Sequence, residues 1–198
     1  FVLWLRRRAR FRLIVSLHGH DVLGDAERSA YERRQFCQLL AQADAITACS
    51  ADLRARAIAL VPSAAPRIAV HYNGVDLTRF ADRTPYEHPR PYVLYVGRLV
   101  STKGVDLLVQ AFAQAAQNNS ELDLLLAGEG ELHQSLSAQA SALGMEKRVH
   151  LLGRASPQDV VRLLNSAQFA VFPSRAEPFG IVAVEAMAAG KAVLATHV

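Results

Sequence analysis

Residues 92–127 read YVLYVGRLVSTKGVDLLVQAFAQAAQNNSELDLLLA. Two short apolar runs, 92–96 and 122–127, flank a longer helical run over 105–117. A strand, a helix and a second strand in this order are typical of parallel strands joined by a crossover helix. The stretch therefore predicts an α/β fold built on a parallel sheet.

The same alternation extends outward from this stretch. Downstream we expect helices over 132–143, 157–165 and 181–189, and strands over 149–152, 169–172 and 192–195. Upstream we expect strands over 13–17, 45–48 and 68–71, a helix over about 26–43 and a second helix that begins after Ser50. Turn-forming residues are concentrated between 73 and 91 and indicate a linker. We therefore predict two domains, 1–88 and 89–198.

The composition excludes several classes of protein. A chain of 198 residues that is 51% hydrophobic and 20% charged is too apolar for a disordered tail and is not a collagen-like rod. Its two cysteines, Cys37 and Cys49, support neither a disulfide framework nor a structural zinc site, and they favour a reducing compartment. The net charge of +4 originates in residues 1–90, which hold 14 arginines and 9 acidic residues. Nothing in these features indicates a nucleic-acid partner.

The first residues, FVLWLRRRAR, combine an apolar run with basic residues. Five apolar residues are far fewer than the roughly 20 that span a bilayer, and a signal peptide would carry its charges first. The five arginines between Arg6 and Arg12 favour peripheral contact with an anionic membrane surface, and a solvated helix end is the alternative. We expect a cytoplasmic protein, either free or at the inner face of the membrane. Because the chain begins inside an apolar run and without Met, we expect a fragment of a longer protein.

The loop GRLVSTKG at 97–104 follows a strand and opens a helix. Arg98 and Lys103 would lie beside the positive end of the helix dipole, an arrangement that suits a diphosphate. A surface loop with two cations is the alternative. It is not a Walker loop, because Thr102 precedes the lysine and no Ser or Thr follows it.

A second loop contains Gly128-Glu129-Gly130. A dinucleotide fingerprint requires a third glycine where His133 stands, so the pattern indicates only a tight turn. A nicotinamide-dependent oxidoreductase is therefore the least favoured class of enzyme.

The stretch PSRAEPFGIVAVEAMAAGKAV at 173–193 carries two carboxylates near one helix start. Glu177 precedes Pro178, which favours an extended backbone, and Gly180 permits a close backbone approach. Glu185 follows about one turn into the helix. Two such carboxylates are costly unless ligand hydroxyls or a cation interact with them. A glycosidase pair is an alternative that requires opposed carboxylates about 5 to 9 Å apart.

These motifs, in this order, resemble those of the retaining GT-B glycosyltransferases of family 4, also called glycosyl transferases group 1. The resemblance runs from about residue 18 to the last residue. It rests on the segments LHGHD, NGVDLTRF, GRLVSTKG, AGEGEL, VHLLGR and EPFGIVAVE.

The resemblance implies two Rossmann-like parallel-sheet domains, both incomplete in this chain. It implies transfer of a sugar from a nucleotide diphosphate sugar to a hydroxyl of a glycan, lipid or small-molecule acceptor, with retention of configuration, as in polysaccharide or glycolipid biosynthesis. No cofactor and no metal are implied, and the sequence has no DxD triplet. These residues alone are expected to transfer no sugar. A nucleotide-sugar-binding fragment without turnover is the alternative.

The resemblance also implies roles for individual residues. Arg98 and Lys103 would hold the diphosphate, Glu177 would orient the sugar, and His18 would face the reacting sugar, with His20 an equal candidate. The remaining donor-binding residues would be Gly128, Gly153, Arg154, Phe179, Gly180, Ile181 and Glu185.

Overall fold

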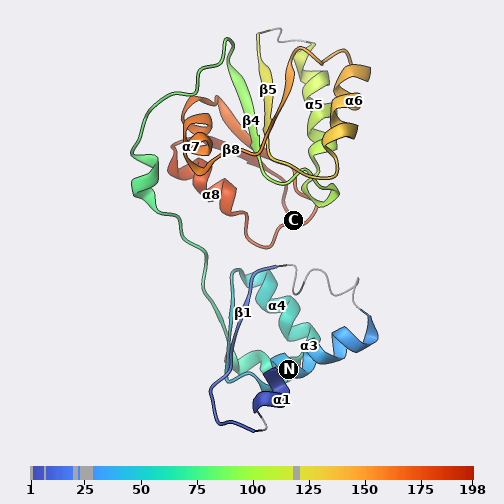
Figure 1. Cartoon of the computed structure of the whole chain (residues 1–198), viewed down its shortest axis with the longest axis vertical. Helices are drawn as coiled ribbons and strands as arrows, with labels where there is room; N and C mark the ends of the chain where they lie inside the picture. Colours follow the sequence, from blue (N-terminus) through green and yellow to red (C-terminus); the bar gives the residue numbers. More distant parts are fainter. Residues whose placement is uncertain (1, 7, 20–21, 23–28, 118–120) are drawn as a thin grey trace. The chain divides into compact units, whose positions relative to one another are not determined.

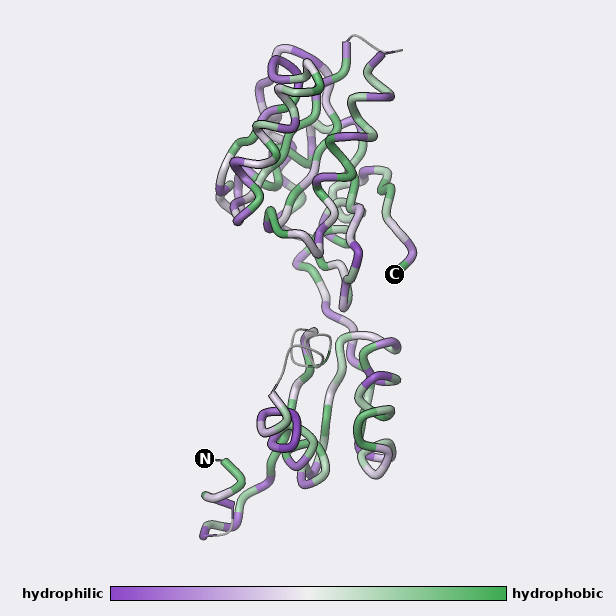
Figure 2. Tube along the Cα trace, turned by 90° about the vertical axis from the view of Figure 1, so that its right-hand side faces the viewer, coloured by the Kyte–Doolittle hydropathy of each residue, from purple (hydrophilic) through white to green (hydrophobic). Residues whose placement is uncertain are grey.

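The computed structural model describes residues 2–6, 8–19, 22, 29–117 and 121–198. They form two compact units, Phe1–Asn73 and Gly74–Val198, and each unit contains its own parallel sheet flanked by helices (Figure 1). Apolar and polar residues alternate along the helices of both units (Figure 2). The predicted α/β class is confirmed. No helix among the described residues is long and apolar enough to span a membrane.

The first unit contains a three-stranded sheet in the order β1-β2-β3. Two serines begin its longer helices: Ser29 forms a capping box with Glu32, and the Ser50 side chain accepts a hydrogen bond from the Leu53 amide. The helix expected from about residue 26 is described from Ala30, and residues 26–28 lie outside the described part. The elements are α1 (Val2–Arg6), β1 (Ile14–Leu17), α3 (Ala30–Gln42), β2 (Ala45–Ala48), α4 (Ala51–Leu60), η2 (Pro62–Arg67) and β3 (Ile68–Val70).

The second unit contains a five-stranded sheet in the order β6-β5-β4-β7-β8. Its elements are η3 (Leu77–Phe80), β4 (Tyr92–Val96), η4 (Ser101–Lys103), α5 (Val105–Ala116), β5 (Asp123–Ala127), α6 (His133–Ala142), β6 (Val149–Gly153), α7 (Pro157–Ser166), β7 (Phe169–Phe172), α8 (Ile181–Ala188) and β8 (Ala192–Ala195). The strand order reverses between β4 and β7. In open parallel sheets, ligands bind at the carboxyl ends of the strands at such a switch point.

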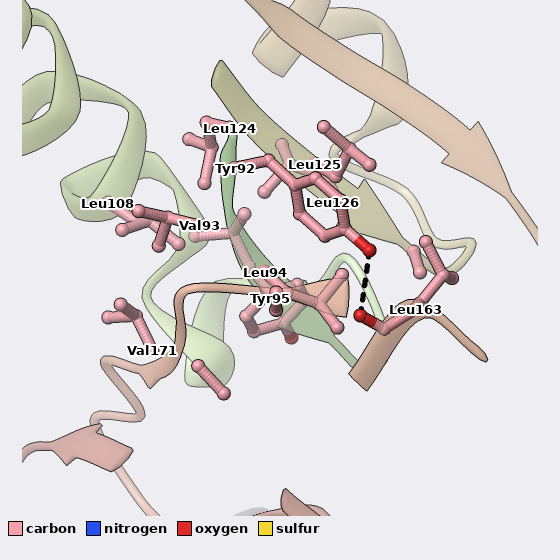
Figure 3. Packing of buried hydrophobic residues seen from close by; sticks show 14 of the residues in the cluster. Tyr92, Val93, Leu94, Tyr95, Leu108, Leu124, Leu125, Leu126, Leu163 and Val171 are labelled. Carbon is pink, nitrogen blue, oxygen red and sulfur yellow. Dashed lines mark hydrogen bonds between the residues drawn. The ribbon is translucent and has the colours of Figure 1, made fainter. Parts of the chain in front are cut away.

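The central strands of this sheet are buried on both faces. Every residue of β5 and four of the five residues of β4 are buried, as expected for a parallel sheet covered by helices. Figure 3 shows residues 92–95 of β4 and 124–126 of β5 packed together. The Tyr92 hydroxyl donates to the Leu163 carbonyl at 2.8 Å. Strands β2, β4, β7 and β8 have the bounds that the sequence predicted.

The segment before β4 packs on the second unit. Phe80 is buried in its core, and the Tyr86 amide donates to the Ser166 hydroxyl at 2.8 Å. The two units therefore divide between Asn73 and Gly74, whereas the turn-forming residues led us to predict a boundary near residue 88. A cluster of turn formers locates a connection, but it does not show on which unit the connection packs.

A buried carboxylate ties the same segment to the amino end of the sheet. Asp123 is 1% exposed, and its Oδ2 lies 2.8 Å from His88 Nε2 and 3.2 Å from His150 Nε2. Its Oδ1 lies 3.6 Å from Arg90 Nε and 3.8 Å from Arg148 Nε. Four basic side chains thus surround one acid, a cluster that the sequence analysis did not anticipate.

Candidate active site

A cavity of about 420 Å³ opens at the switch point of the second sheet. The loops after β4, β7 and β8 and the first turn of α8 form its walls. It brings together six of the predicted site residues: Arg98, Lys103, Glu177, Phe179, Gly180 and Ile181.

Lys103 and Glu177 form an ion pair in this cavity. Lys103 Nζ lies 2.6 Å from Glu177 Oε2, and the buried Ser174 hydroxyl donates to the same oxygen at 3.2 Å. An ammonium group has three hydrogens, so one bond to Glu177 leaves two for an anion. Lys103 can therefore hold Glu177 in place and still bind a phosphate.

Tyr95 supports the loop that carries Arg98. Its hydroxyl donates to the Arg98 carbonyl at 2.8 Å, and burial, together with the nearby Glu177 carboxylate, raises the pKa of Tyr95. The phenol therefore stays protonated and remains a donor at neutral pH. A Cβ at Gly97 would lie 2.8 Å from this hydroxyl oxygen, so the turn requires a glycine there. The Arg98 side chain is exposed and lines the cavity.

The first turn of α8 also faces the cavity. Gly180 precedes the helix with φ +81°, and no side chain caps the helix start. The first amides of a helix lack intrahelical acceptors and carry partial positive charge. Ile181, Val182 and Ala183 line the cavity at this point, so the turn adds an anion-binding element to the cavity that the two cations line.

A second cavity of about 350 Å³ lies beside the first and shares Arg98 with it. Gly128 and Arg154 line it, as do the last residue of β5 and the start of the next loop. The Gly128 amide donates to the Gly153 carbonyl at 2.8 Å, and a Cβ at Gly128 would overlap the Gly97 carbonyl oxygen. The glycine turn after β5 is therefore required for close packing of adjacent loops.

Three predicted site residues lie outside both cavities. Glu185 is in α8, where its Oε1 is 3.8 Å from the Arg79 guanidinium. Gly153 contributes its carbonyl to the Gly128 amide. His18 follows β1 in the first unit, with its Nε2 2.9 Å from the Ser16 hydroxyl, and His20 lies outside the described residues.

Each of the two carboxylates near the α8 start has a cationic partner within the chain. Glu177 is paired with Lys103, and Glu185 lies near Arg79. Glu185 does not line the cavity that contains Glu177, so this cavity does not present the two opposed carboxylates that a glycosidase requires.

One further group of side chains has the composition of a metal site. Within the described residues, the ligand atoms of His88, Asp123 and His150 lie within 4.8 Å of one another. This group is at the amino ends of the strands, away from the cavities, and the guanidiniums of Arg90 and Arg148 already supply positive charge to Asp123. We infer that this group anchors the segment before β4 to the amino end of the sheet.

Comparison with protein families explains this combination of fold and site. The family model "Glycosyl transferases group 1" matches residues 78–198, which is more than half of the chain. The chain belongs to this family. A second model, "Glycosyltransferase Family 4", matches residues 1–79 of this group 1 glycosyl transferase.

Individual relatives agree with the family assignment. Glycogen synthase from Mycobacterium tuberculosis is 33% identical over 91% of the chain and 44% of its own length. D-inositol 3-phosphate glycosyltransferase from Nocardia farcinica is 32% identical over 98% of the chain and 48% of its own length. The chain therefore spans about half the length of the curated relatives it matches.

Solved structures show the same fold. The Anabaena protein HepE, crystallised with UDP and glucose, has a TM-score of 0.81 and 27% identity over 96% of the chain and 54% of its own. Sucrose-phosphate synthase from Thermosynechococcus elongatus has a TM-score of 0.81 and 25% identity, and the match covers 98% of this chain and 52% of the synthase.

Proposed function

We propose that this group 1 glycosyl transferase moves a sugar from a nucleotide diphosphate sugar to a hydroxyl acceptor, with retention of configuration at the anomeric carbon. The observation that carries the proposal is the convergence of Arg98, Lys103 and the first turn of α8 on one cavity with Glu177. Similarity to HepE, which was crystallised with UDP and glucose, supports a nucleotide sugar as the donor.

The chemistry follows from the charges that develop during the reaction. As the bond to the anomeric carbon breaks, negative charge grows on the diphosphate and positive charge grows on the sugar ring. Arg98, Lys103 and the α8 amides are fixed near the developing negative charge, where preorganised donors stabilise the transition state most. These groups supply the positive charge themselves, so the proposed reaction uses neither a metal nor a cofactor.

The other predicted residues would bind the rest of the donor. Glu177 accepts hydrogen bonds from sugar hydroxyls, with Phe179 and the Gly180–Ile181 backbone beside it. Glu185 binds the ribose, and the base lies against Gly128 and Arg154 in the second cavity, with Gly153 next to Arg154 in the chain. The role that the resemblance implies for His18, facing the reacting sugar, stays a prediction.

We propose a glycan, a lipid or a small molecule as the acceptor, and a cytoplasmic location at or near the inner face of the membrane. The support for membrane contact is the first segment, where the Arg8 guanidinium stacks over the Trp4 ring at 4.1 Å and Arg10 and Arg12 are exposed. Basic residues beside an exposed aromatic ring suit an anionic lipid surface.

The test is sugar transfer by the full-length protein from a panel of UDP, GDP and ADP sugars. Lys103→Ala and Arg98→Ala should each lower kcat by about 100-fold, the effect of losing one preorganised donor. Lys147→Ala and Arg162→Ala are matched controls, because both residues are exposed and line neither cavity.

Two results would contradict the proposal. If nucleotide binds but no sugar is transferred to any acceptor, the non-catalytic alternative holds. If both cavity variants keep kcat within threefold of wild type, the diphosphate assignment is wrong.

A further inference from the structure

Two loops bring Lys103 and Glu177 into the first cavity from neighbouring strands. Lys103 ends the loop after β4, and Glu177 lies in the loop after β7. Strands β4 and β7 are paired directly, with Val93 opposite Phe169. The strands alone do not fix the distance between the two side chains, because both lie several residues beyond the sheet.

A separate set of contacts joins these loops on the outside of the cavity. Arg175 donates from Nη1 to Asp106 Oδ1 at 2.8 Å and from Nη2 to Asp106 Oδ2 at 2.7 Å. Its Nη1 also donates to the Ser101 carbonyl at 2.5 Å, and its amide donates to the Thr102 carbonyl at 2.8 Å. One residue of the second loop is thus bonded to two residues of the first loop and to Asp106 in the helix that follows it.

The Asp106 end of this contact is rigid. Asp106 lies in the first turn of α5, where the helix dipole favours a carboxylate. The hydrogen bond from Arg175 lowers the pKa of Asp106, so the acid is ionised throughout the neutral range. A two-bond pair between a planar guanidinium and a carboxylate fixes orientation as well as distance.

Neither partner reaches the cavity. Arg175 and Asp106 are absent from its lining, and their side chains are 43% and 38% exposed. They are nevertheless close in sequence to the cavity pair: Arg175 precedes Glu177 by two positions, and Asp106 follows Lys103 by three. Any effect on the reaction must therefore pass through the positions of Lys103 and Glu177.

We propose that Arg175 and Asp106 are positioning residues that hold Lys103 and Glu177 at their working separation before the donor binds. This inference rests on the proposed function. An exposed ion pair adds little to stability, whereas a displacement of about 1 Å in a reacting site can lower turnover by about 100-fold. The pair should therefore matter far more for turnover than for folding.

The kinetic test uses full-length Arg175→Ala, Asp106→Ala and the double variant. Each single variant should lower kcat by about 10-fold or more, and the double variant should be no slower than the slower single variant, because one contact is lost in all three. Arg175→Lys should recover only part of kcat, since an ammonium cannot form the two-bond pair. The melting temperatures should fall by less than about 3 °C.

Arg56→Ala is the matched control. Arg56 forms an exposed pair with Asp52 in α4 of the first unit, with Nε 2.7 Å from Oδ2. Its loss should leave kcat unchanged. A kcat of Arg175→Ala within twofold of wild type would overturn the proposal, as would rate losses that multiply in the double variant.

A crystal structure of Arg175→Ala tests the positioning without any measurement of turnover. We expect the Lys103–Glu177 pair, 2.6 Å in the wild type, to separate or become disordered. A variant that keeps this pair at its wild-type distance would overturn the positioning role even if the protein transferred sugar. Absence of transfer by the wild type together with loss of the pair in the variant would instead contradict only the proposed function.

Discussion

At the first cavity, Lys103 and Glu177 form an ion pair, and the Ser174 hydroxyl donates a second hydrogen bond to the same carboxylate oxygen. Such pairing keeps both ionised groups in place without ligand, so little rearrangement is needed when a diphosphate arrives. Preorganisation of this kind is the main source of electrostatic catalysis in enzymes.

Asp123 is the charged side chain whose loss should most affect stability. Asp123→Asn removes the carboxylate that contacts His88, Arg90, Arg148 and His150. We expect the free energy of unfolding to fall by about 3 kcal/mol, as for other broken buried ion pairs. Urea unfolding of the full-length protein measures it.

Asp159→Asn is the control for this substitution, because Asp159 is 47% exposed and lies 3.9 Å from Arg162, and an asparagine oxygen can still accept the hydrogen bond from the Ser156 hydroxyl. It should change the free energy of unfolding by less than about 0.5 kcal/mol. Equal effects of the two substitutions would show that the Asp123 cluster does not anchor the linker.

At the scale of secondary structure, the sequence predicted the strands well because their signals are local. The apolar runs of β4 and β7 are bounded by Gly, Pro and polar residues, and both strands have the predicted bounds. The loops with Arg98, Lys103 and Glu177 were also located, since motifs at strand ends are contiguous in sequence.

Pairs between distant segments could not be predicted in this way. Arg175 and Asp106 are 69 positions apart, and His88 and Asp123 are 35 apart. Whether such residues meet depends on the strand order and on the path of each loop, which no local pattern encodes. Asp123 in particular is buried at the start of β5, and its local sequence does not indicate which basic side chains surround it.

The contact between the loops after β4 and β5 should be intolerant of any side chain. Gly128→Ala would place a Cβ against the Gly97 carbonyl oxygen, so the loops must separate. We expect the free energy of unfolding to fall by more than about 2 kcal/mol. Gly144→Ala is the control: φ is +68° there, but the added Cβ would have no neighbour within 4 Å.

The Gly144→Ala control should lower the free energy of unfolding only by the cost of the added backbone strain, about 1 kcal/mol. Denaturant unfolding of both variants separates steric overlap from strain. Comparable losses at the two positions would mean that the loops can move apart freely.

At the scale of the whole molecule, the two units have separate sheets, and both cavities belong to the second unit. The proposed donor contacts are therefore formed almost entirely by one unit. His18, a further predicted site residue, belongs to the first unit.

Chelation should leave the enzyme active. In the proposed mechanism Arg98, Lys103 and the α8 amides neutralise the leaving diphosphate, which is the role a divalent ion would otherwise have. We expect the rate of sugar transfer to stay within about twofold of the untreated rate after EDTA treatment and gel filtration. An enzyme that EDTA silences and that magnesium or manganese restores would contradict this mechanism.

We infer that the cavity between the β4 and β7 loops binds the diphosphate of a nucleotide sugar. Calorimetric titration of the full-length protein with UDP, GDP and ADP tests it most directly, with the corresponding nucleosides as phosphate-free ligands. We predict that at least one diphosphate binds and that Arg98→Ala/Lys103→Ala weakens its binding by about 100-fold or more, whereas Lys147→Ala/Arg162→Ala does not. Binding of the diphosphate by the cavity variant as tightly as by the wild type would contradict the claim.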